Sequence, residues 1–153
     1  MAGIGKAHLR DKKDALLQVE NLVVEYKSPG GGSVQAVSDV SLDIVAGETV
    51  AVVGESGCGK STLAKGVLQL VPATSGSVSL NGTDLTKLKG EALRRARPNI
   101  QMIFQDSISS LDPHLKVRGL IEQPLKVWGR GTEEERRKKV DELLRSVNLD
   151  PEV

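Results

Sequence analysis

The stretch that decides the fold spans residues 48–71 and reads ETVAVVGESGCGKSTLAKGVLQLV. It opens with an apolar run over Thr49 to Val53, passes through the pattern G-x-x-x-x-G-K-S over residues 54–61, and continues with apolar residues at helical spacing. A buried strand, a glycine-rich loop and an amphipathic helix in this order predict a loop that binds phosphate groups through its backbone. The rest of the sequence is interpreted around this loop.

The composition is that of one globular domain without a large net charge. Of the 153 residues 39% are apolar, and 21 Lys and Arg residues against 20 Asp and Glu residues leave a formal charge of +1. This composition supports a buried core and gives no electrostatic reason to expect a nucleic-acid partner. Cys58 is the only cysteine, which excludes an intramolecular disulfide and favours a reducing, cytoplasmic location. No run approaches the ~20 apolar residues of a membrane-spanning helix, and residues 1–14 lack the apolar core of a secretory signal.

Two strands are expected before the glycine-rich loop. Residues 1–15 are polar and predict a mobile leader. Residues 17–26 are rich in β-forming side chains and stop at the loop signal SPGGGS over residues 28–33. Apolar and polar residues alternate over 40–44 and predict the second strand.

Two helices and two strands are expected after the loop. In chain order they are a helix over 63–71 that stops at Pro72, a strand over 77–80 with a turn at 81–82, a short helix over 91–97, and an apolar strand over 100–104. The last strand is expected to be buried on both faces of a parallel sheet. It would place Gln105 at its carboxyl end, where ligands bind in such sheets.

Two helical segments follow. The first covers residues 117–128 and is expected to be interrupted or kinked at Pro124, with Trp128 interpreted as a core residue. The second begins with Thr132 and Glu135 at the spacing of a capping box. Its expected apolar stripe consists of Val140, Leu143, Leu144 and Val147.

Each position of the glycine-rich loop has a chemical reason. Glycines let successive backbone N–H groups point inward as an anion-binding nest, and the start of the following helix adds the positive end of its dipole. Lys60 supplies a mobile positive charge for terminal phosphates, and the Ser61 hydroxyl can take one coordination position on Mg²⁺. Cys58 stands at a variable position of the pattern and is expected to contribute only its backbone.

Three groups of residues together resemble the ATP-binding subunits of ABC transporters. They are GESGCGKST over 54–62, SGSV over 75–78 followed by NG at 81–82, and QMIFQD over 101–106 with SLDP over 110–113. The last group is most similar to the peptide (dipeptide and oligopeptide) importers, and the resemblance covers residues 16–153. It implies an α/β fold with a leader over 1–15, a P-loop NTPase core of the ABC type with an antiparallel β subdomain over 16–106, and the start of a helical subdomain over 107–153.

The resemblance also implies roles for single residues. Lys60 and Gln105 are the implied catalytic residues, Ser61 and Gln105 the implied metal contacts, and Tyr26 the aromatic residue that stacks on adenine. ATP and Mg²⁺ are the implied cofactors, and the nucleotide would be held by Tyr26, Gly54, Ser56, Gly57, Cys58, Gly59, Lys60, Ser61 and Thr62. From the residues alone, Gln105 stays open as a polar residue that caps a strand, and Tyr26 as a core or edge-strand residue.

Three further motifs of that family have no counterpart in this sequence. They are the Ser-Gly-Gly-Gln signature, the apolar strand that ends in Asp-Glu, and the later switch histidine. Gly30–Ser33 lies too early for the signature, and neither His8 nor His114 stands where the switch would. Asp141–Glu142 follows Lys138, Lys139 and Val140 on an expected helix, so it is not the end of a buried strand. We therefore expect an incomplete central sheet, marginal stability, and little or no ATP hydrolysis by this chain alone.

The implied function is that of a cytoplasmic ATPase subunit that energises import of a small solute such as a peptide. It would lie at the inner face of the cell membrane, bound to membrane-spanning subunits and paired head to tail with a second ATP-binding subunit. Two alternatives stay open: a binding module that holds nucleotide without turnover, and a non-transport ATPase of the same superfamily. A P-loop kinase would need an acceptor site and a lid, for which the sequence offers no candidate.

Overall fold

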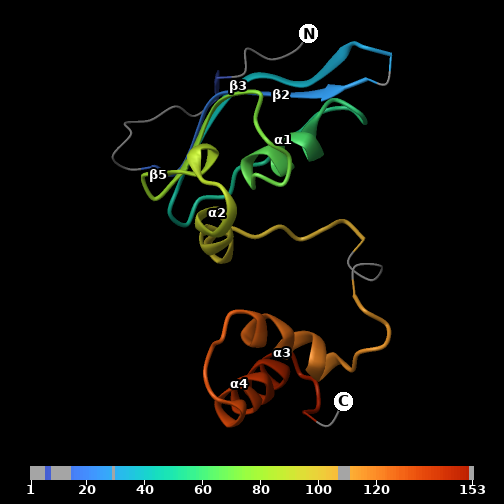
Figure 1. The fold of residues 1–153 in the computed structure, drawn as a ribbon. Coiled ribbons are helices and arrows are strands. Elements are labelled where there is room, and N and C mark those ends of the chain that lie inside the picture. Colours follow the sequence, from blue (N-terminus) through green and yellow to red (C-terminus); the bar gives the residue numbers. More distant parts are fainter. Residues whose placement is uncertain (1–5, 8–14, 29, 107–110, 152–153) are drawn as a thin grey trace. The chain divides into compact units, whose positions relative to one another are not determined.

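The computed structural model describes residues 6–7, 15–28, 30–106 and 111–151. The chain forms two compact units, Met1–Met102 and Ile103–Val153, and each is described by itself (Figure 1). The first unit contains the glycine-rich loop and the second consists mainly of two helices.

Five strands of the described residues form one sheet in the first unit, in the order β1-β3-β2-β4-β5. All neighbours pair antiparallel except β1, which runs parallel to β3. The strands are β1 (Lys6–Ala7), β2 (Ala15–Lys27), β3 (Ser33–Val45), β4 (Ser75–Leu80) and β5 (Thr83–Asp84). The expected leader thus contributes β1 and the first residue of β2, and the rest of the leader lies outside the described residues.

The hairpin of β2 and β3 changes its register several times. Buried residues of β2 have odd numbers up to Val19 and even numbers from Leu22, because Asn21, at φ 49°, lies in an irregular step of the pairing. Asn21 Nδ2 donates to Asp39 Oδ1 at 2.6 Å, and the Asn21 backbone N–H donates to Ser41 Oγ at 2.8 Å. These bonds connect the two strands where the ladder is interrupted.

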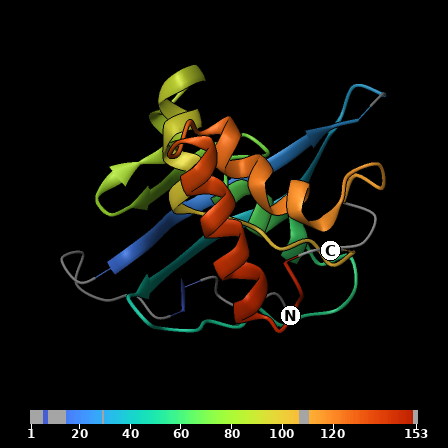
Figure 2. The same cartoon turned by 90° about the horizontal axis from the view of Figure 1, so that it is seen from below.

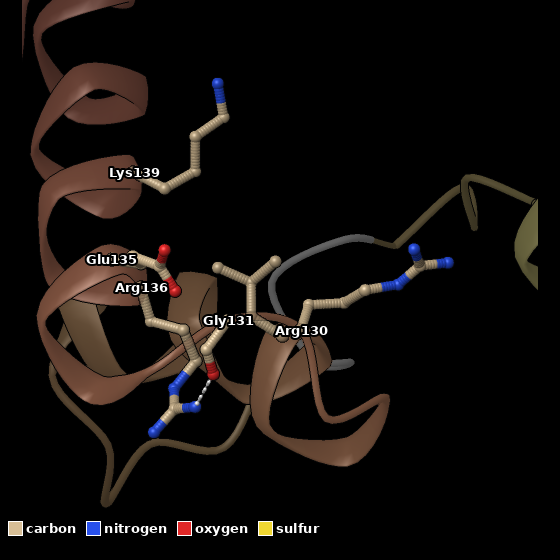
Figure 3. A pocket seen from close by; sticks show the side chains of 6 residues that line it. Arg130, Gly131, Glu135, Arg136 and Lys139 are labelled. Atoms are coloured by element: carbon tan, nitrogen blue, oxygen red, sulfur yellow. Dashed lines mark hydrogen bonds between the residues drawn. The ribbon is translucent and has the colours of Figure 1, made fainter.

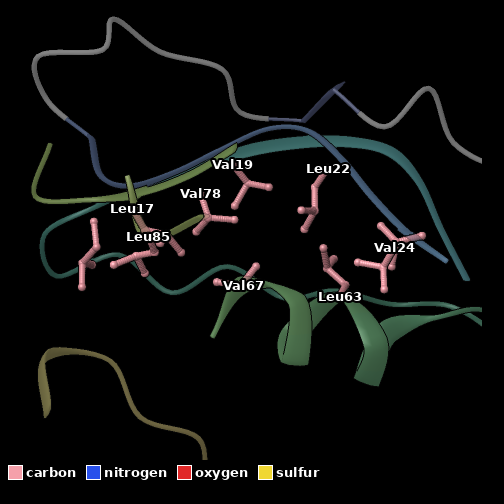
Figure 4. Packing of buried hydrophobic residues seen from close by; sticks show 10 residues of the cluster. Leu17, Val19, Leu22, Val24, Leu63, Val67, Val78 and Leu85 are labelled. Carbon is pink, nitrogen blue, oxygen red and sulfur yellow. The ribbon is translucent and has the colours of Figure 1, made fainter. Parts of the chain in front are cut away.

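Helix α1 (Lys60–Val67) packs its apolar side against the sheet. Leu63 and Val67 face the buried residues of β2 and β4 (Figure 4). The core cluster consists of Leu17, Val19, Leu22, Val24, Val37, Leu63, Val67, Val78, Leu80 and Leu85. The helix is shorter than expected: it ends before Gln69, whose backbone is left-handed at φ 52° and whose Nε2 donates to the Gly66 carbonyl at 2.7 Å.

Two strands expected from the sequence are not strands in the structure. Residues 49–53 and 100–104 belong to no sheet, and Val53 and Ile103 are 91% and 92% exposed. A strand of a parallel sheet needs a neighbour for its backbone N–H and C=O groups. Neither run has such a neighbour within the residues that the structure describes, so the expected parallel core strands do not form there, whereas the antiparallel sheet does.

Short elements follow the sheet. They are η1 (Leu85–Lys87), α2 (Gly90–Ala96) and η2 (Arg97–Asn99), so the expected short helix is present. Asp84 caps η1, and its Oδ1 accepts from the Thr86 N–H at 3.0 Å. Partial burial alone would raise the pKa of Asp84, but hydrogen bonds from Thr86 and Lys87 outweigh it and lower that pKa.

The second unit is a helical hairpin of α3 (Val117–Val127) and α4 (Glu133–Ser146), which lie side by side in both Figure 1 and Figure 2. α3 continues through Pro124, so the expected interruption does not occur. Half of the expected stripe of α4 is buried, namely Val140 and Leu144, whereas Leu143 and Val147 are 41% and 62% exposed. They are exposed because α3 is the only helix that packs on α4 within the described part of this unit.

An ion-pair network joins the two helices of the second unit. Glu122 of α3 accepts from Lys126 at 2.9 Å and from Arg136 of α4 at 3.4 Å. The bond from Lys126, with help from Arg136, lowers the pKa of Glu122 despite some desolvation. None of the helices described is long and apolar enough to cross a membrane.

Candidate phosphate-binding loop

The candidate site lies at the N-terminus of α1. Gly59 caps the helix with a left-handed backbone at φ 95°, no side chain caps the N-terminus, and the first turn contains no acidic residue. The Leu63 N–H donates to the Gly59 carbonyl at 2.8 Å, which begins the helical ladder. The N–H groups of the first turn lack intrahelical acceptors, so this end of α1 has the donors and the positive dipole end that an anion requires.

Lys60 closes the loop from within. Its Nζ donates to the Gly54 carbonyl at 2.8 Å and to the Glu55 carbonyl at 2.6 Å, and it lies 3.6 Å from Cys58 Sγ. All three donors of the ammonium group are therefore directed into the loop. A phosphate oxygen would compete well for one of them, because hydrogen bonds between charged groups are stronger than those to neutral carbonyls.

Two glycines of the loop have no room for a side chain. A Cβ at Gly59 would lie 2.2 Å from the carbonyl oxygen of Ala36 in β3, and a Cβ at Gly54 would lie 2.7 Å from Cys58 Sγ. Gly57, at φ 82°, has open space around it, so only its backbone conformation favours glycine. The loop thus lies directly against the backbone of β3.

Cys58 makes contacts through its side chain as well as through its backbone, although only a backbone role is expected from the sequence. Its N–H donates to the Glu55 carbonyl at 3.3 Å, while its sulfur lies near Lys60 and fills the space beside Gly54. The thiol is free and exposed. Cys58 therefore contributes to the shape of the loop through its side chain as well as through its backbone.

Tyr26 lies on the hairpin against which the loop rests. It is 41% exposed and pairs with Val34, two positions along β3 from Ala36. Two strand positions correspond to about 7 Å. The interpretation of Tyr26 as a core residue is therefore wrong, and its strand partner Val34 lies two positions from the residue that contacts Gly59.

Most of the other predicted site residues lie in or directly after the loop, and Gln105 does not. Ser56 and Ser61 are exposed and Thr62 is half-buried, all within the loop or the first turn of α1. Gln105 is exposed and belongs to the second unit, so its role beside the loop stays a prediction. Sequence reasoning missed Ala36, because no pattern in the sequence shows that its carbonyl contacts Gly59.

The second unit has an open hollow of its own, of about 340 Å³ (Figure 3). Leu125, Arg130, Gly131, Glu135, Arg136 and Lys139 line it. Glu135 caps α4 by accepting from the Thr132 N–H at 2.7 Å, which, together with the Thr132 side chain, lowers the pKa of Glu135. Arg136 donates to the Gly131 carbonyl at 2.6 Å, and Arg130 extends away from the hollow. These bonds stabilise the helical hairpin, and the glycine-rich loop remains the candidate site.

Comparisons with known proteins agree on one family. The model of the family described as "ABC transporter" matches residues 37–152. The chain is 43% identical over 146 residues to the "Probable peptide ABC transporter ATP-binding protein y4tS" of Sinorhizobium fredii, which covers 92% of this chain and 41% of that protein. It is 44% identical over 121 residues to the "Oligopeptide transport ATP-binding protein AppF" of Bacillus subtilis, which covers 78% of this chain and 37% of that protein.

A solved structure gives the same result. The dimeric structure of MJ0796, a bacterial ABC transporter cassette, has a TM-score of 0.73 and 32% sequence identity to this chain, and covers 84% of this chain and 56% of that one. The chain therefore spans 41% or less of the two curated relatives named above and about half of that solved chain.

Proposed function

This chain belongs to the ABC transporter family, and we propose that it holds the phosphates of ATP as part of an ATP-binding subunit. The subunit would energise a transporter that imports a small solute, and peptides are the proposed class of solute. The fold class expected from the sequence, an ABC-type P-loop core with an antiparallel β subdomain, is confirmed by the likeness to the solved cassette. Two relatives with peptide or oligopeptide transport in their names support the proposed solute class.

The observation that carries this proposal is the position of Lys60. Its ammonium group lies inside a loop of glycines at the uncapped start of α1, with carbonyl partners that a phosphate oxygen can replace. The residues proposed to hold ATP are Gly54, Ser56, Gly57, Cys58, Gly59, Lys60, Ser61 and Thr62 for the phosphates and Tyr26 for adenine.

The donor set also suits Mg²⁺. Ser61 is exposed in the first turn of α1, and a hydroxyl oxygen is a ligand that Mg²⁺ accepts. When bound, Mg²⁺ neutralises charge on the terminal phosphates of ATP. Gln105 is the second residue proposed to contact Mg²⁺.

The proposed partners are membrane-spanning subunits and a second ATP-binding subunit, and the proposed location is the cytoplasmic face of the cell membrane. The solved cassette of MJ0796 is a dimer, which supports the proposed pairing. Co-purification with membrane-spanning subunits would support a transport role, whereas tight binding to nucleic acid would support a non-transport ATPase.

Calorimetric titration of the chain with Mg-ATP tests the site. We expect Lys60→Ala to weaken binding about 10- to 150-fold, because a hydrogen bond to a charged group contributes about 1.5–3 kcal/mol. Lys65→Ala is the matched control, because it removes the same charge from the same helix without touching the loop. Equal losses in the two variants, or no binding by the parent, would contradict the proposal.

Phosphate release measured in the same samples separates turnover from binding. The cradle alone supplies no positioned base, so we expect little release by this chain. Binding without release would favour the alternative of a nucleotide-binding module, and release that saturates with Mg-ATP would favour the ATPase.

A further inference from the structure

Where β2 and β3 pair close to the glycine-rich loop, β3 has one extra residue between two consecutive pairs. Val24 of β2 pairs with Val37, and the next residue, Glu25, pairs with Gln35. Ala36 is therefore the extra residue of a β-bulge. Bulges leave the extra residue outside the regular ladder and turn its backbone groups in a new direction.

The carbonyl of this extra residue lies against the loop. A Cβ built on Gly59 would lie 2.2 Å from the Ala36 oxygen and 3.4 Å from the Ala36 carbonyl carbon. The backbone of Gly59 is thus already in contact with that carbonyl. The bulge is the point where the hairpin supports the loop.

Contacts on both sides of the bulge hold α1 and the segment after it to the hairpin. A Cβ on Gly66 would lie 3.1 Å from Val24 Cγ2, so the helix packs tightly on β2 there. The Glu25 N–H donates to Thr74 Oγ1 at 3.0 Å, which ties the segment after α1 to the same strand. Tyr26 follows directly and pairs with Val34, beyond the bulge. The bulge therefore lies where the loop, α1 and the part of β2 that carries Tyr26 meet.

We propose that Ala36 is a positioning residue whose bulged carbonyl sets the spacing between the phosphate loop and Tyr26, and thereby determines how strongly the site prefers a nucleoside triphosphate over a triphosphate without a base. This inference rests on the proposed function, in which the loop holds phosphates and Tyr26 holds the base. Ala36 acts through the backbone and through Tyr26, and it needs no contact of its own with the ligand.

The test compares the affinity of the full 153-residue chain for Mg-ATP with its affinity for inorganic triphosphate and Mg²⁺. Stacking of a base on an aromatic side chain contributes about 5- to 150-fold, so the parent is expected to prefer ATP within that range. Deleting Ala36 makes the ladder regular, because Glu25–Gln35 then follows Val24–Val37 directly. The ATP preference is expected to fall to within about 2-fold of unity, while affinity for inorganic triphosphate stays within about 3-fold of the parent.

Three further variants keep the test decisive. Ala36→Gly retains the carbonyl but loosens the bulge, and we expect it to lower the ATP preference about 2- to 5-fold even if the deletion variant fails to fold. In a Tyr26→Ala background the same changes at Ala36 are expected to have no further effect on the preference, because both residues act through one contact. Asp39→Ala is the matched control, since it breaks the 2.6 Å bond to Asn21 at another irregular step of the hairpin and should leave the preference unchanged.

The possible results separate this proposal from the proposed function. An unchanged ATP preference in whichever Ala36 variant folds, or parallel losses for both ligands, would overturn the role of Ala36. Equal affinity of the parent for both ligands would overturn it as well, while phosphate binding would stand. Failure of the parent to bind either ligand would refute the proposed function itself.

Discussion

Replacing Gly59 by alanine tests the contact between the loop and β3. The new Cβ would lie 2.2 Å from the Ala36 oxygen, about 1 Å closer than real Cβ atoms approach, and the neighbour is backbone that cannot rotate away. Accommodating the methyl group is expected to cost about 1–3 kcal/mol, and the left-handed backbone at φ 95° adds about 1–2 kcal/mol for a non-glycine residue. The sum, about 2–5 kcal/mol, is a large part of the stability of a typical domain.

Gly57→Ala provides the matched comparison. Gly57 has a similar backbone, φ 82°, but nothing lies within 4 Å of a Cβ there, so only the conformational cost of about 1–2 kcal/mol applies. Urea unfolding of the parent and the two variants, followed by far-UV circular dichroism, gives the free energies of unfolding. Equal destabilisation by the two substitutions would show that the loop does not rest on β3, and the reasoning would be refuted.

Three further predictions concern stability. Thr132→Ala removes the side-chain acceptor of the capping box and should destabilise α4 by about 1 kcal/mol. Hydrogen exchange of the first amides of α4 should then be faster. Ser146→Ala, at the other end of α4, is the control and should not affect those amides. The pKa values of Glu122 and Glu135 are lowered, so their contribution to stability is complete above the ordinary glutamate pKa and is lost as pH falls through the lowered values. An acid titration followed by helicity should therefore show that the helices of the second unit lose stability. Glu122→Gln should make this loss depend less on pH. Val19→Ala should cost about 2–3 kcal/mol in urea unfolding because Val19 is fully buried, whereas Val53→Ala, at a 91% exposed position, should change the free energy of unfolding by less than about 0.5 kcal/mol.

The sequence predicts well the elements whose causes are local. The apolar pattern of β2, the turn after β4, and the Thr132–Glu135 capping box all depend on residues close together in the chain, and the structure contains each of them. The position of the glycine-rich loop at the start of α1 is predicted for the same reason, because its glycines, Lys60 and the helix are consecutive, whereas the binding roles of these residues stay predictions.

What depends on neighbours distant in the chain is predicted poorly. The runs over 49–53 and 100–104 have the composition of buried parallel strands, but a strand exists only with a partner, and composition does not supply one. The bulge at Ala36 cannot be predicted from the sequence for a related reason. It is defined by the pairing of β2 with β3, and a shift of register leaves no trace in the alternation of a few residues.

The loop is held at its two ends by different interactions. On the side of α1, Gly59 rests on Ala36 and Gly66 packs on Val24, so the hairpin contacts the helix near both of its ends. On the other side, the carbonyls of Gly54 and Glu55 are held by Lys60. A phosphate that draws the Lys60 ammonium away therefore removes the bonds of one end of the loop and leaves those of the other intact. On the proposed function, phosphate binding is expected to exchange the hydrogen bonds at one end of the loop for contacts with the ligand, while the start of α1 and the hairpin that carries Tyr26 are expected to keep their positions.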